Sequence, residues 1–455
     1  IGMQDTKSLS RIENQNASNK QLISGLVDLV NQPGVSHKSI TDVRGNFVLM
    51  TEVVWGTLGD YFAGYKLINA LRERNPHMRI TWLILDKHNG VPTEKNNANG
   101  VYLFKDWNEL FAEKHPVTKI LLSADAILQF PTFHFLENVS KIRLSKLCKP
   151  RVTPKECLEY DYQSSRKGIS DVVSAGLGHD SLGIFLDDFG DLKMAERLAS
   201  LPTQLKRLFG SAKIDSQSYF INHALFVGYR NKEEHRVVSK EVNIPNFIHT
   251  IAELAQLDGD LKDKEVVDIV APILADEEKQ LDHQRLADCG FQTVLFINIT
   301  GDQRTTPLVS AGKKLMRIIN PFRLDNAHLK VLIASAHPFI LCTGDQSLSE
   351  VLSKNNPKCG HVGLPFYQTM AWKTGLFAAL RMRVKQVCGT DSALDRFFAA
   401  ITDIINPKEL AKLLCEPDLY QDMLKLYLFI AQHKNLYANL PQYIEQSMLE
   451  CGAVR

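Results

Sequence analysis

Short β-rich runs alternate with amphipathic helical stretches along most of the chain, and this alternation constrains the fold more than any other feature. The run "FVLMTEVVW" at 47–55 predicts a strand, "GTLGD" interrupts it, "YFAGYKLINALRERN" has apolar residues at helical spacing, and "RITWLILD" predicts a second strand. This order is a βαβ unit, which places parallel strands in one sheet. We therefore expect an α/β fold.

A second alternating series begins at "HALFVGYRN" (223–231) and continues through the strand-like runs "EVVDIVAPI", "FQTVLFINI", "MRIINPF" and "HPFILC". Two series predict two Rossmann-like, doubly wound domains, and 455 residues exceed what one compact core usually holds. The predicted segments are a polar helical extension at 1–45, two α/β domains at 46–220 and 221–404, and a helical tail at 405–455.

The charge balance argues against nucleic acid as a partner. Lys and Arg number 53 against 51 Asp and Glu, which gives a formal net charge of +2. The sequence has no arginine-rich run and no basic stripe interleaved with aromatic residues, which are typical of nucleic-acid binding.

The apolar runs and the cysteine spacing indicate the cellular compartment of the protein. No window reaches the roughly 18 apolar residues that a membrane span requires, so we expect no span. The eight cysteines have no CxxC spacing, which in a chain of this size indicates reduced thiols. We expect a cytoplasmic protein, and export to another cell stays open.

The stretch "TGDQSLSEVL" (343–352) contains the strongest candidate for a binding site, because a strand there turns into a helix. A helix N-terminus attracts anions, and the small residues Gly344 and Ser347 would let a phosphate approach the backbone. Glu350, one turn inside the helix, could accept hydrogen bonds from ribose hydroxyls. The alternative is that Asp345 or Ser347 caps the helix and Glu350 completes a capping box.

The region around this turn resembles the C-terminal half of the GT-B glycosyltransferases. The matching positions of the Gly-x-x-Ser-x-x-Glu and Gly-x-Pro segments are Gly344, Ser347, Glu350, Gly363, Pro365 and Gln368. The segment "GTLGDYFAGYKLINAL" is similar to the first strand-to-helix loop of that family. The resemblance covers residues 45–390 in outline.

The resemblance implies a fold and an activity. It implies two Rossmann-like domains that face a cleft, the first for the acceptor and the second for the nucleotide sugar, with the tail crossing back over the first domain. It implies a metal-independent, inverting glycosyltransferase that uses a nucleoside-diphosphate sugar as co-substrate and needs no other cofactor.

The resemblance also assigns roles at the first loop. Asp60 is the candidate catalytic base, and Gly56, Thr57 and Gly59 form the acceptor loop. The alternative is that Asp60 is the N-cap of a helix that begins at Tyr61.

On the donor side, the leaving diphosphate would lie on the N–H groups of Gly344, Asp345, Gln346 and Ser347. The side chains expected to assist are Arg304 at the phosphates, Phe322 at the nucleobase, Glu350 at the ribose and Gln368 at the sugar hydroxyls. An exposed, idle arginine, a core aromatic residue and a surface amide are the alternatives for Arg304, Phe322 and Gln368. Tyr229 and Asn231 are weaker candidates at the domain entry.

A narrower similarity links Gly59-Asp60 and the turn Gly344-Asp345-Gln346-Ser347 to the protein-arginine rhamnosyltransferases. The chain departs from that family at Gln346, where the family has an acid, and in its middle region. A protein side chain as acceptor is therefore an open alternative.

Two other functions remain open on the same scaffold, a sugar-nucleotide 2-epimerase and a catalytically silent binding protein. The sequence has no HExxH, EF-hand, GxSxG or Walker motif, and "LDD" at 186–188 lacks the DxD spacing of metal-dependent transferases. We expect no metal site.

Overall fold

The structure is a computed structural model. It describes residues 40–53, 58–87, 91, 100–112, 114–132, 138–162, 172–187, 201–209, 216–230, 243–321, 324, 326–357, 362–368, 373–402 and 404–455. The residues form two compact units, described separately below. Of the described residues, those within 40–186, 373–380 and 430–455 form the N-terminal unit, and those within 187–368 and 381–429 form the C-terminal unit.

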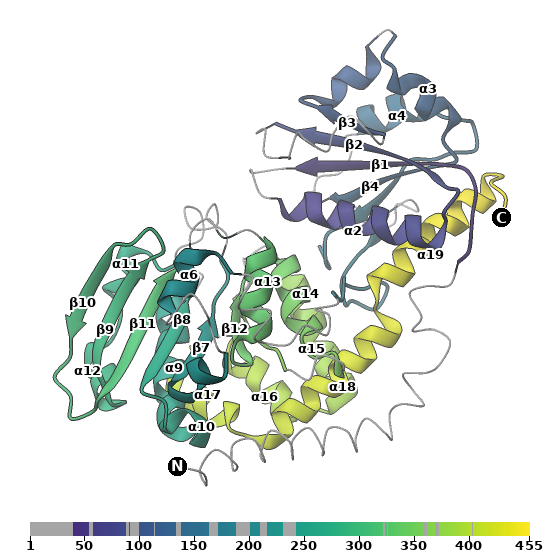
Figure 1. Cartoon of the computed structure of the whole chain (residues 1–455). Coiled ribbons are helices and arrows are strands. Elements are labelled where there is room, and N and C mark those ends of the chain that lie inside the picture. The colour runs from purple at the N-terminus through teal and green to yellow at the C-terminus, as the bar shows by residue number, and fades with distance from the viewer. Residues whose placement is uncertain are drawn as a thin grey trace. The chain divides into compact units, whose positions relative to one another are not determined.

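The N-terminal unit contains a six-stranded sheet in the order β3-β2-β1-β4-β5-β6, in which every pairing is parallel (Figure 1). Its strands are β1 (Asn46–Val53), β2 (Arg79–Asp86), β3 (Val101–Phe104), β4 (Ala126–Thr132), β5 (Lys155–Leu158) and β6 (Val172–Ser174). Its helices are α2 (Gly59–Arg74), the 3-10 helix η2 (Trp107–Phe111), α3 (Val117–Ser123), α4 (Asn138–Lys146) and α19 (Leu436–Glu450). The predicted βαβ unit is present as β1, α2 and β2.

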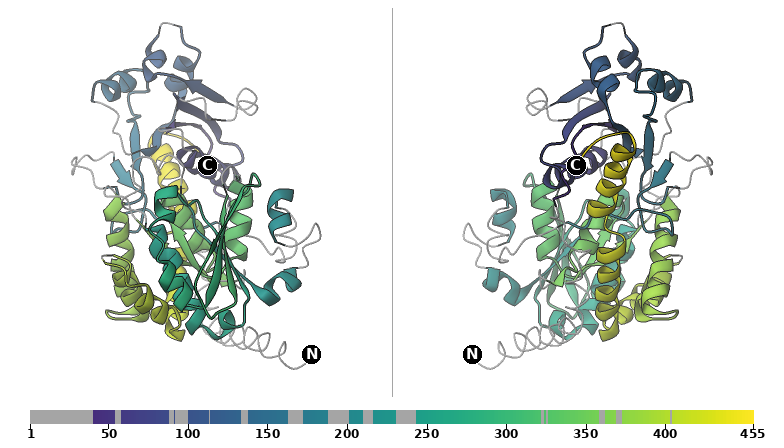
Figure 2. Two further views of the ribbon diagram at one scale, coloured as in Figure 1. Left: turned by 90° about the vertical axis from the view of Figure 1, so that its left-hand side faces the viewer. Right: turned by 90° about the vertical axis from the view of Figure 1, so that its right-hand side faces the viewer.

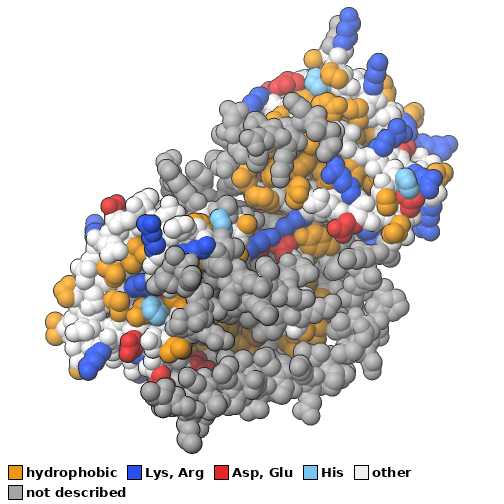
Figure 3. Space-filling model, viewed as in Figure 1, with side chains coloured by type: hydrophobic (Ala, Val, Ile, Leu, Met, Phe, Trp, Pro, Cys, Tyr) orange, Lys and Arg blue, Asp and Glu red, His pale blue; other side chains and the backbone are white. Residues whose placement is uncertain are grey.

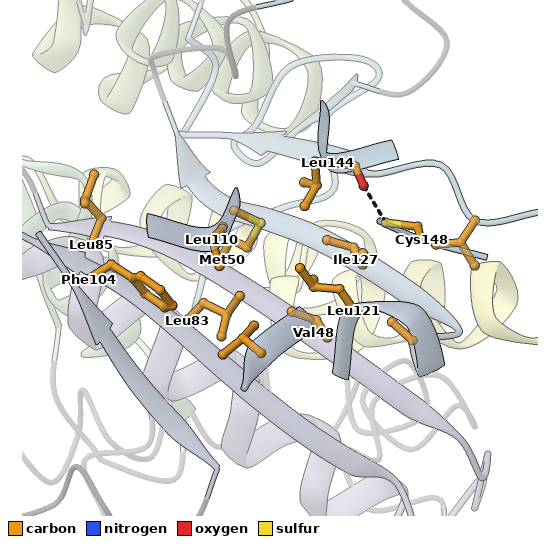
Figure 4. Packing of buried hydrophobic residues seen from close by; sticks show 13 residues of the cluster. Val48, Met50, Leu83, Leu85, Phe104, Leu110, Leu121, Ile127, Leu144 and Cys148 are labelled. Atoms are coloured by element: carbon orange, nitrogen blue, oxygen red, sulfur yellow. Dashed lines mark hydrogen bonds between the residues drawn. The ribbon is translucent and has the colours of Figure 1, made fainter. Parts of the chain in front are cut away.

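One face of this sheet packs on η2, α3 and α4. The core of that layer is aliphatic and aromatic, and Figure 4 shows Met50 beside Leu110, with Leu121 and Ile127 further along the strands. The strands contribute every second residue to this layer, such as Val48 and Met50 of β1, because successive side chains of a strand point to opposite faces. The other face packs on α2, where Gly64 allows close approach: a Cβ there would lie 2.9 Å from the Trp82 ring.

A buried ion pair joins α19 to α2, and the two helices lie side by side (Figures 1 and 2). Arg74 Nε and Nη2 donate to the two carboxylate oxygens of Glu445 at 2.7 and 2.8 Å. Asn75 Nδ2 and Thr41 Oγ1 donate to the same carboxylate at 2.9 and 3.0 Å. The C-terminal helix is thus fixed to the first helix of the sheet by charge-assisted hydrogen bonds.

The C-terminal unit contains a second sheet in the order β10-β9-β11-β8-β7, parallel except for β10, and a pair β12-β13. Its strands are β7 (His223–Val227), β8 (Val266–Val270), β9 (Phe291–Asn298), β10 (Gln303–Pro307), β11 (Lys314–Asn320), β12 (Phe339–Cys342) and β13 (Leu364–Tyr367). A parallel bridge between Gly228 and Leu341 joins β12 to the end of β7, so the sheet continues to β13.

Helices cover this sheet and form the end of the chain. They are α6 (Thr203–Leu208), α7 (Ser216–Asn222), α9 (Ile244–Leu257), α10 (Gly259–Lys262), α11 (Ala275–Glu278), α12 (His283–Asp288), α13 (Asn326–Ser335), α14 (Asp345–Ser353), α16 (Ala393–Ala400) and α17 (Pro407–Leu414). The helices α15 (Thr374–Cys388) and α18 (Pro417–His433) contain residues of both units. Helix α17 packs against α9.

The predicted α/β class with two doubly wound sheets is confirmed, and the tail is helical from α17 to α19. The chain divides after Leu186, whereas the sequence analysis placed the boundary after residue 220. Residues 1–39 of the predicted extension lie outside the described residues.

The described surface agrees with the near-zero charge balance. Basic and acidic side chains are interspersed over the face shown in Figure 3. Among the described helices, none has the length and apolar character that crossing a bilayer demands.

The Arg74–Glu445 pair makes a prediction about stability. Burial alone would raise the pKa of Glu445, but the hydrogen bonds from Arg74, Asn75 and Thr41 lower it below its usual value. We expect Glu445→Gln to lower the free energy of unfolding by about 3 kcal/mol at pH 7, because it leaves a buried guanidinium without its counter-charge. Since the folded pKa is lowered, the difference from wild type should shrink as the pH falls through it. Urea unfolding of Glu445→Gln and of exposed Glu450→Gln at pH 7 and pH 4 checks this; equal losses in both variants would contradict it.

A second prediction concerns His249 on α9. Its Nε2 accepts a hydrogen bond from the backbone N–H of Asp282 at 2.8 Å, and burial, assisted by the charge of Arg285, lowers its pKa to about 4. The unfolded chain protonates this residue near pH 6.5, so its neutral state stabilises the fold above that pH and the contribution is lost between about 6.5 and 4.

Between pH 7 and pH 5 we therefore expect the unfolding free energy of wild type to fall by about 2 kcal/mol more than that of His249→Gln. Denaturant titrations at the two pH values measure the difference. The control His283→Gln changes an exposed histidine next to Asp282, so its stability should fall with pH as that of wild type does. Parallel pH dependence of wild type and His249→Gln would contradict the prediction.

Candidate functional site

The strand order of the C-terminal unit reverses between β7 and β12. From β7 the chain adds β8, β9 and β11 on one side, and then returns to add β12 and β13 on the other. In open α/β sheets, ligands bind at such a reversal, outside the carboxyl ends of the two strands. The residues that follow β7 and β12 are therefore the candidate site.

The turn after β12 opens directly into α14. Gly344 is the N-cap residue with an extended backbone, at φ −115° and ψ 171°, and α14 begins at Asp345. The Ser347 hydroxyl accepts a hydrogen bond from the Gly344 N–H and donates to the Gly344 carbonyl, both at 3.0 Å. Ser347 is thus the third residue of the helix, and its hydroxyl caps the N-terminus through the Gly344 N–H, as the alternative held for Ser347; the capping box is formed with Gly344, not with Glu350. The first-turn N–H groups lie at the strand edge with the positive end of the helix dipole.

Glu350 lies in the second turn of α14 and is 3% exposed. It is close to Cys342, the last residue of β12: burial raises the pKa of the Cys342 thiol, and the charge of Glu350 raises it further. The sequence predicted that Glu350 points back toward the crevice. The structure places it beside the end of β12 in the interior of the unit.

Two neighbouring strand ends adjoin the Gly344 turn. The backbone N–H of Gln368, which follows β13, donates to the Cys342 carbonyl at 3.0 Å. The N–H of Tyr229, which follows β7, donates to the Leu341 carbonyl at 2.8 Å. Gln368 is buried, and its side-chain contacts to the carbonyls of Tyr367 and Ile401 are long, at 3.4 and 3.5 Å. The structure therefore brings together three of the strand ends that the sequence singled out.

Arg304 is not part of this group. It lies on β10, the antiparallel edge strand, and β9, β11 and β8 separate it from β7. Its guanidinium donates to both carboxylate oxygens of Glu278 at 2.6 Å and lies over the Phe296 ring. Ile299 and Thr300 lie in a tight turn, closed by a hydrogen bond from the Gly301 N–H to the Asn298 carbonyl, that sends the chain back along β9, so Arg304 lies within a strand.

Arg230 is the arginine that the sequence analysis missed. It follows Tyr229 at the end of β7, with a fully buried side chain. Its Nη1 and Nη2 donate to the Glu277 carboxylate at 2.8 and 2.6 Å, and Nη2 also donates to the Pro272 carbonyl at 3.0 Å. The pair fixes the segment after β8 to the end of β7. A signal was present, since an arginine ends the apolar run "HALFVGYR" and the acidic run "ADEE" follows the next strand.

In the N-terminal unit the strand order reverses between β1 and β4. Helix α2 begins at Gly59 with Leu58 as its N-cap, so half-buried Asp60 is the second helical residue and the N-cap alternative for it is wrong. A Cβ at Gly59 would meet no atom within 4 Å. Packing therefore does not require glycine at that position.

Several predicted positions lie outside the described residues, namely Gly56, Thr57, Asn231 and Phe322. Within the described ranges, no group of three or more His, Cys, Asp or Glu side chains is arranged to hold a metal ion.

A scan against protein-family models and a search of curated proteins find no match. Similar solved structures include a glycosyl transferase of family 9 from Veillonella parvula, with a TM-score of 0.32 and 13% identity over 72% of this chain and 83% of that chain. The alpha,alpha-trehalose 6-phosphate synthase from Burkholderia multivorans has a TM-score of 0.43 and 9% identity over 89% of this chain and 98% of that chain. The UDP-GlcNAc 2-epimerase from Methanocaldococcus jannaschii has a TM-score of 0.43 and 13% identity over 88% of this chain and 99% of that chain.

Two glycines of the site differ in the space around them, and this difference distinguishes a binding role from a packing role. A Cβ at Gly344 would meet only the Ser347 Oγ, at an ordinary 3.8 Å, whereas a Cβ at Gly363 would lie 2.1 Å from the Val351 carbonyl oxygen. We expect Gly344→Ala to change the unfolding free energy by no more than about 1 kcal/mol. We expect Gly363→Ala to lower it by about 2–4 kcal/mol through overpacking. Thermal and urea unfolding measure both; equal destabilisation would show that Gly344 serves packing.

Proposed function

We propose that the chain is a metal-independent, inverting glycosyltransferase that moves a sugar from a nucleoside-diphosphate donor to an acceptor. The observation that carries the proposal is the Gly344 turn, which joins the end of β12 to α14 where the strand order reverses. Its support from the sequence is the spacing of Gly344, Ser347 and Glu350 that the GT-B transferases share.

The donor diphosphate binds the first turn of α14 in this proposal. Backbone N–H groups and the helix dipole favour an anion there, and they need no cation to do so. The backbone at Gly344 is approachable, because the only neighbour within 4 Å of an added Cβ is the Ser347 hydroxyl oxygen. Ser347 holds the turn in shape through its two hydrogen bonds to Gly344.

The remaining donor contacts are assigned by position. Glu350, buried close to Cys342 at the end of β12, takes the ribose hydroxyls. Gln368, next to the turn through the Cys342 carbonyl, takes the sugar hydroxyls. Phe322 keeps its proposed place at the nucleobase. Arg304 has no role, because it lies at the opposite edge of the sheet.

The chemistry assigned to the N-terminal unit is base catalysis by Asp60. The acceptor heteroatom attacks the anomeric carbon while its proton passes to the Asp60 carboxylate. The bond between the anomeric carbon and the phosphate oxygen breaks, and its electron pair leaves with the nucleoside diphosphate. Attack opposite the leaving group inverts the configuration. A protein side chain stays open as the acceptor.

Two other functions fit the same nucleotide site or scaffold. A 2-epimerase would also bind the nucleotide sugar but would need no acceptor, and a silent binding protein would lack turnover. Release of nucleoside diphosphate that depends on an added acceptor separates transfer from epimerisation.

The nucleotide site is tested by thermal-shift titration of wild type with UDP, GDP, dTDP, CMP, NAD and ATP. A ligand at a hundredfold its Kd stabilises the fold by about 2.7 kcal/mol, so we expect one nucleoside diphosphate to raise the Tm clearly. We expect Glu350→Ala and Gly344→Ala to reduce this shift at least by half, and exposed Glu265→Gln to preserve it. No shift from any nucleotide in wild type would refute the transferase and favour the silent binding protein.

A further inference from the structure

Gln129 lies in β4 with its carboxamide buried and unpaired. The residue is 1% exposed, and in the part of the chain that the structure describes neither Nε2 nor Oε1 has a hydrogen-bond partner. Buried polar groups of folded proteins are almost always hydrogen-bonded, because an unpaired group loses its hydration without compensation. A buried carboxamide that no described residue pairs at either end is therefore a place where a bound polar ligand would be stabilised.

One in-register neighbour of Gln129 on the same face is a carboxylate, and a second carboxylate lies diagonally across on β1. In register Gln129 lies between Met50 of β1 and Glu156 of β5, at the spacing of about 5 Å between adjacent strands. Glu156 is 1% exposed. Glu52, two residues beyond Met50, accepts a hydrogen bond from Trp107 Nε1 at 2.6 Å. The apolar layer of Figure 4 thus gives way, toward the carboxyl ends of the strands, to one carboxamide and two carboxylates.

This polar group lies toward the carboxyl ends of β1, β4 and β5. The strand order reverses between β1 and β4, and open α/β sheets bind ligands at that edge. The register between β4 and β5 shifts directly after Gln129, and such irregularities commonly re-aim side chains next to binding sites. Glu52 is only half-buried, so the group extends from the interior to the surface.

The donors and acceptors of the group select the class of ligand. The Gln129 Nε2 needs a hydrogen-bond acceptor, and its Oε1 needs a donor. The ionised carboxylates of Glu52 and Glu156 can accept hydrogen bonds but cannot donate them. A guanidinium or ammonium group has donors alone and leaves Nε2 unpaired. A phosphate has acceptors alone, so it finds no donor in the two carboxylates and is repelled by their charge. Hydroxyl groups both donate and accept, so a ligand with several of them pairs both ends of the Gln129 carboxamide and can donate to the carboxylates beside it.

We propose that Gln129, Glu156 and Glu52 form a subsite that binds the hydroxyl groups of a carbohydrate. Glu52, held by Trp107, receives the ligand at the strand edge, and Gln129 pairs with an inner hydroxyl through both ends of its amide. The subsite lies wholly in the N-terminal unit. It does not depend on the nucleotide site proposed at Gly344.

Calorimetric titration of the full chain with methyl glycosides of glucose, galactose, mannose and N-acetylglucosamine tests the subsite. Wild type is expected to bind at least one glycoside, and Gln129→Met to bind it at least tenfold more weakly. Methionine has a similar size and no buried amide to leave unpaired, so the Tm of Gln129→Met should equal or exceed that of wild type. The matched control Gln446→Met, at an exposed position of α19, should bind as wild type does.

The proposal is overturned if wild type binds no glycoside, if Gln129→Met binds as wild type does, or if Gln129→Met lowers the Tm. A parallel titration with N-acetyl-arginine amide tests a cationic ligand. Binding of that probe in place of the glycosides, with loss in Glu52→Gln, would assign the group to a cation and also overturn the proposal. Failure of nucleotide binding in the thermal-shift screen refutes the transferase but not this subsite, so the two failures are distinguishable.

Discussion

The close parallel contact between Gly228 and Leu341 is the interaction on which the candidate nucleotide site depends. A Cβ at position 228 would lie 3.2 Å from both Ala271 Cβ and Leu341 Cδ2, so glycine allows the end of β7 to fit between β8 and β12. The Gly228 N–H then donates to Val270 and the Tyr229 N–H to Leu341, at 2.9 and 2.8 Å. Without this contact β12 would have no place beside β7, and the strand order would not reverse there.

Buried charge pairs hold the elements around the two sheets in position. Arg230 and Glu277 fix the segment after β8, and Arg74 and Glu445 fix the last helix. Such pairs add little net stability, since desolvation offsets most of their attraction, but breaking one leaves an uncompensated charge in the interior. The geometry after β7 and β8 and the position of the last helix therefore depend on charges that are almost wholly buried.

Both sheets follow one physical rule. Their parallel strands are covered on both faces, so the strand interiors are apolar and polar side chains appear where the strands end. In the C-terminal unit this edge presents the Gly344 turn, and in the N-terminal unit it presents Gln129 among glutamates. Because both sheets have such an edge, the two proposed binding sites lie at equivalent positions of the two sheets although their chemistry differs.

The α/β class, the two series of strands and the turn at Gly344 could be predicted from the sequence, because local periodicity records which side of each element is buried. Which strands are neighbours follows from the folded structure alone. It placed Arg304 on an edge strand, buried Arg230 against Glu277 and left Gln129 unpaired. The physical reason is that sheet partners are joined by backbone hydrogen bonds that are alike for every residue and span long separations along the chain, so no local pattern specifies them.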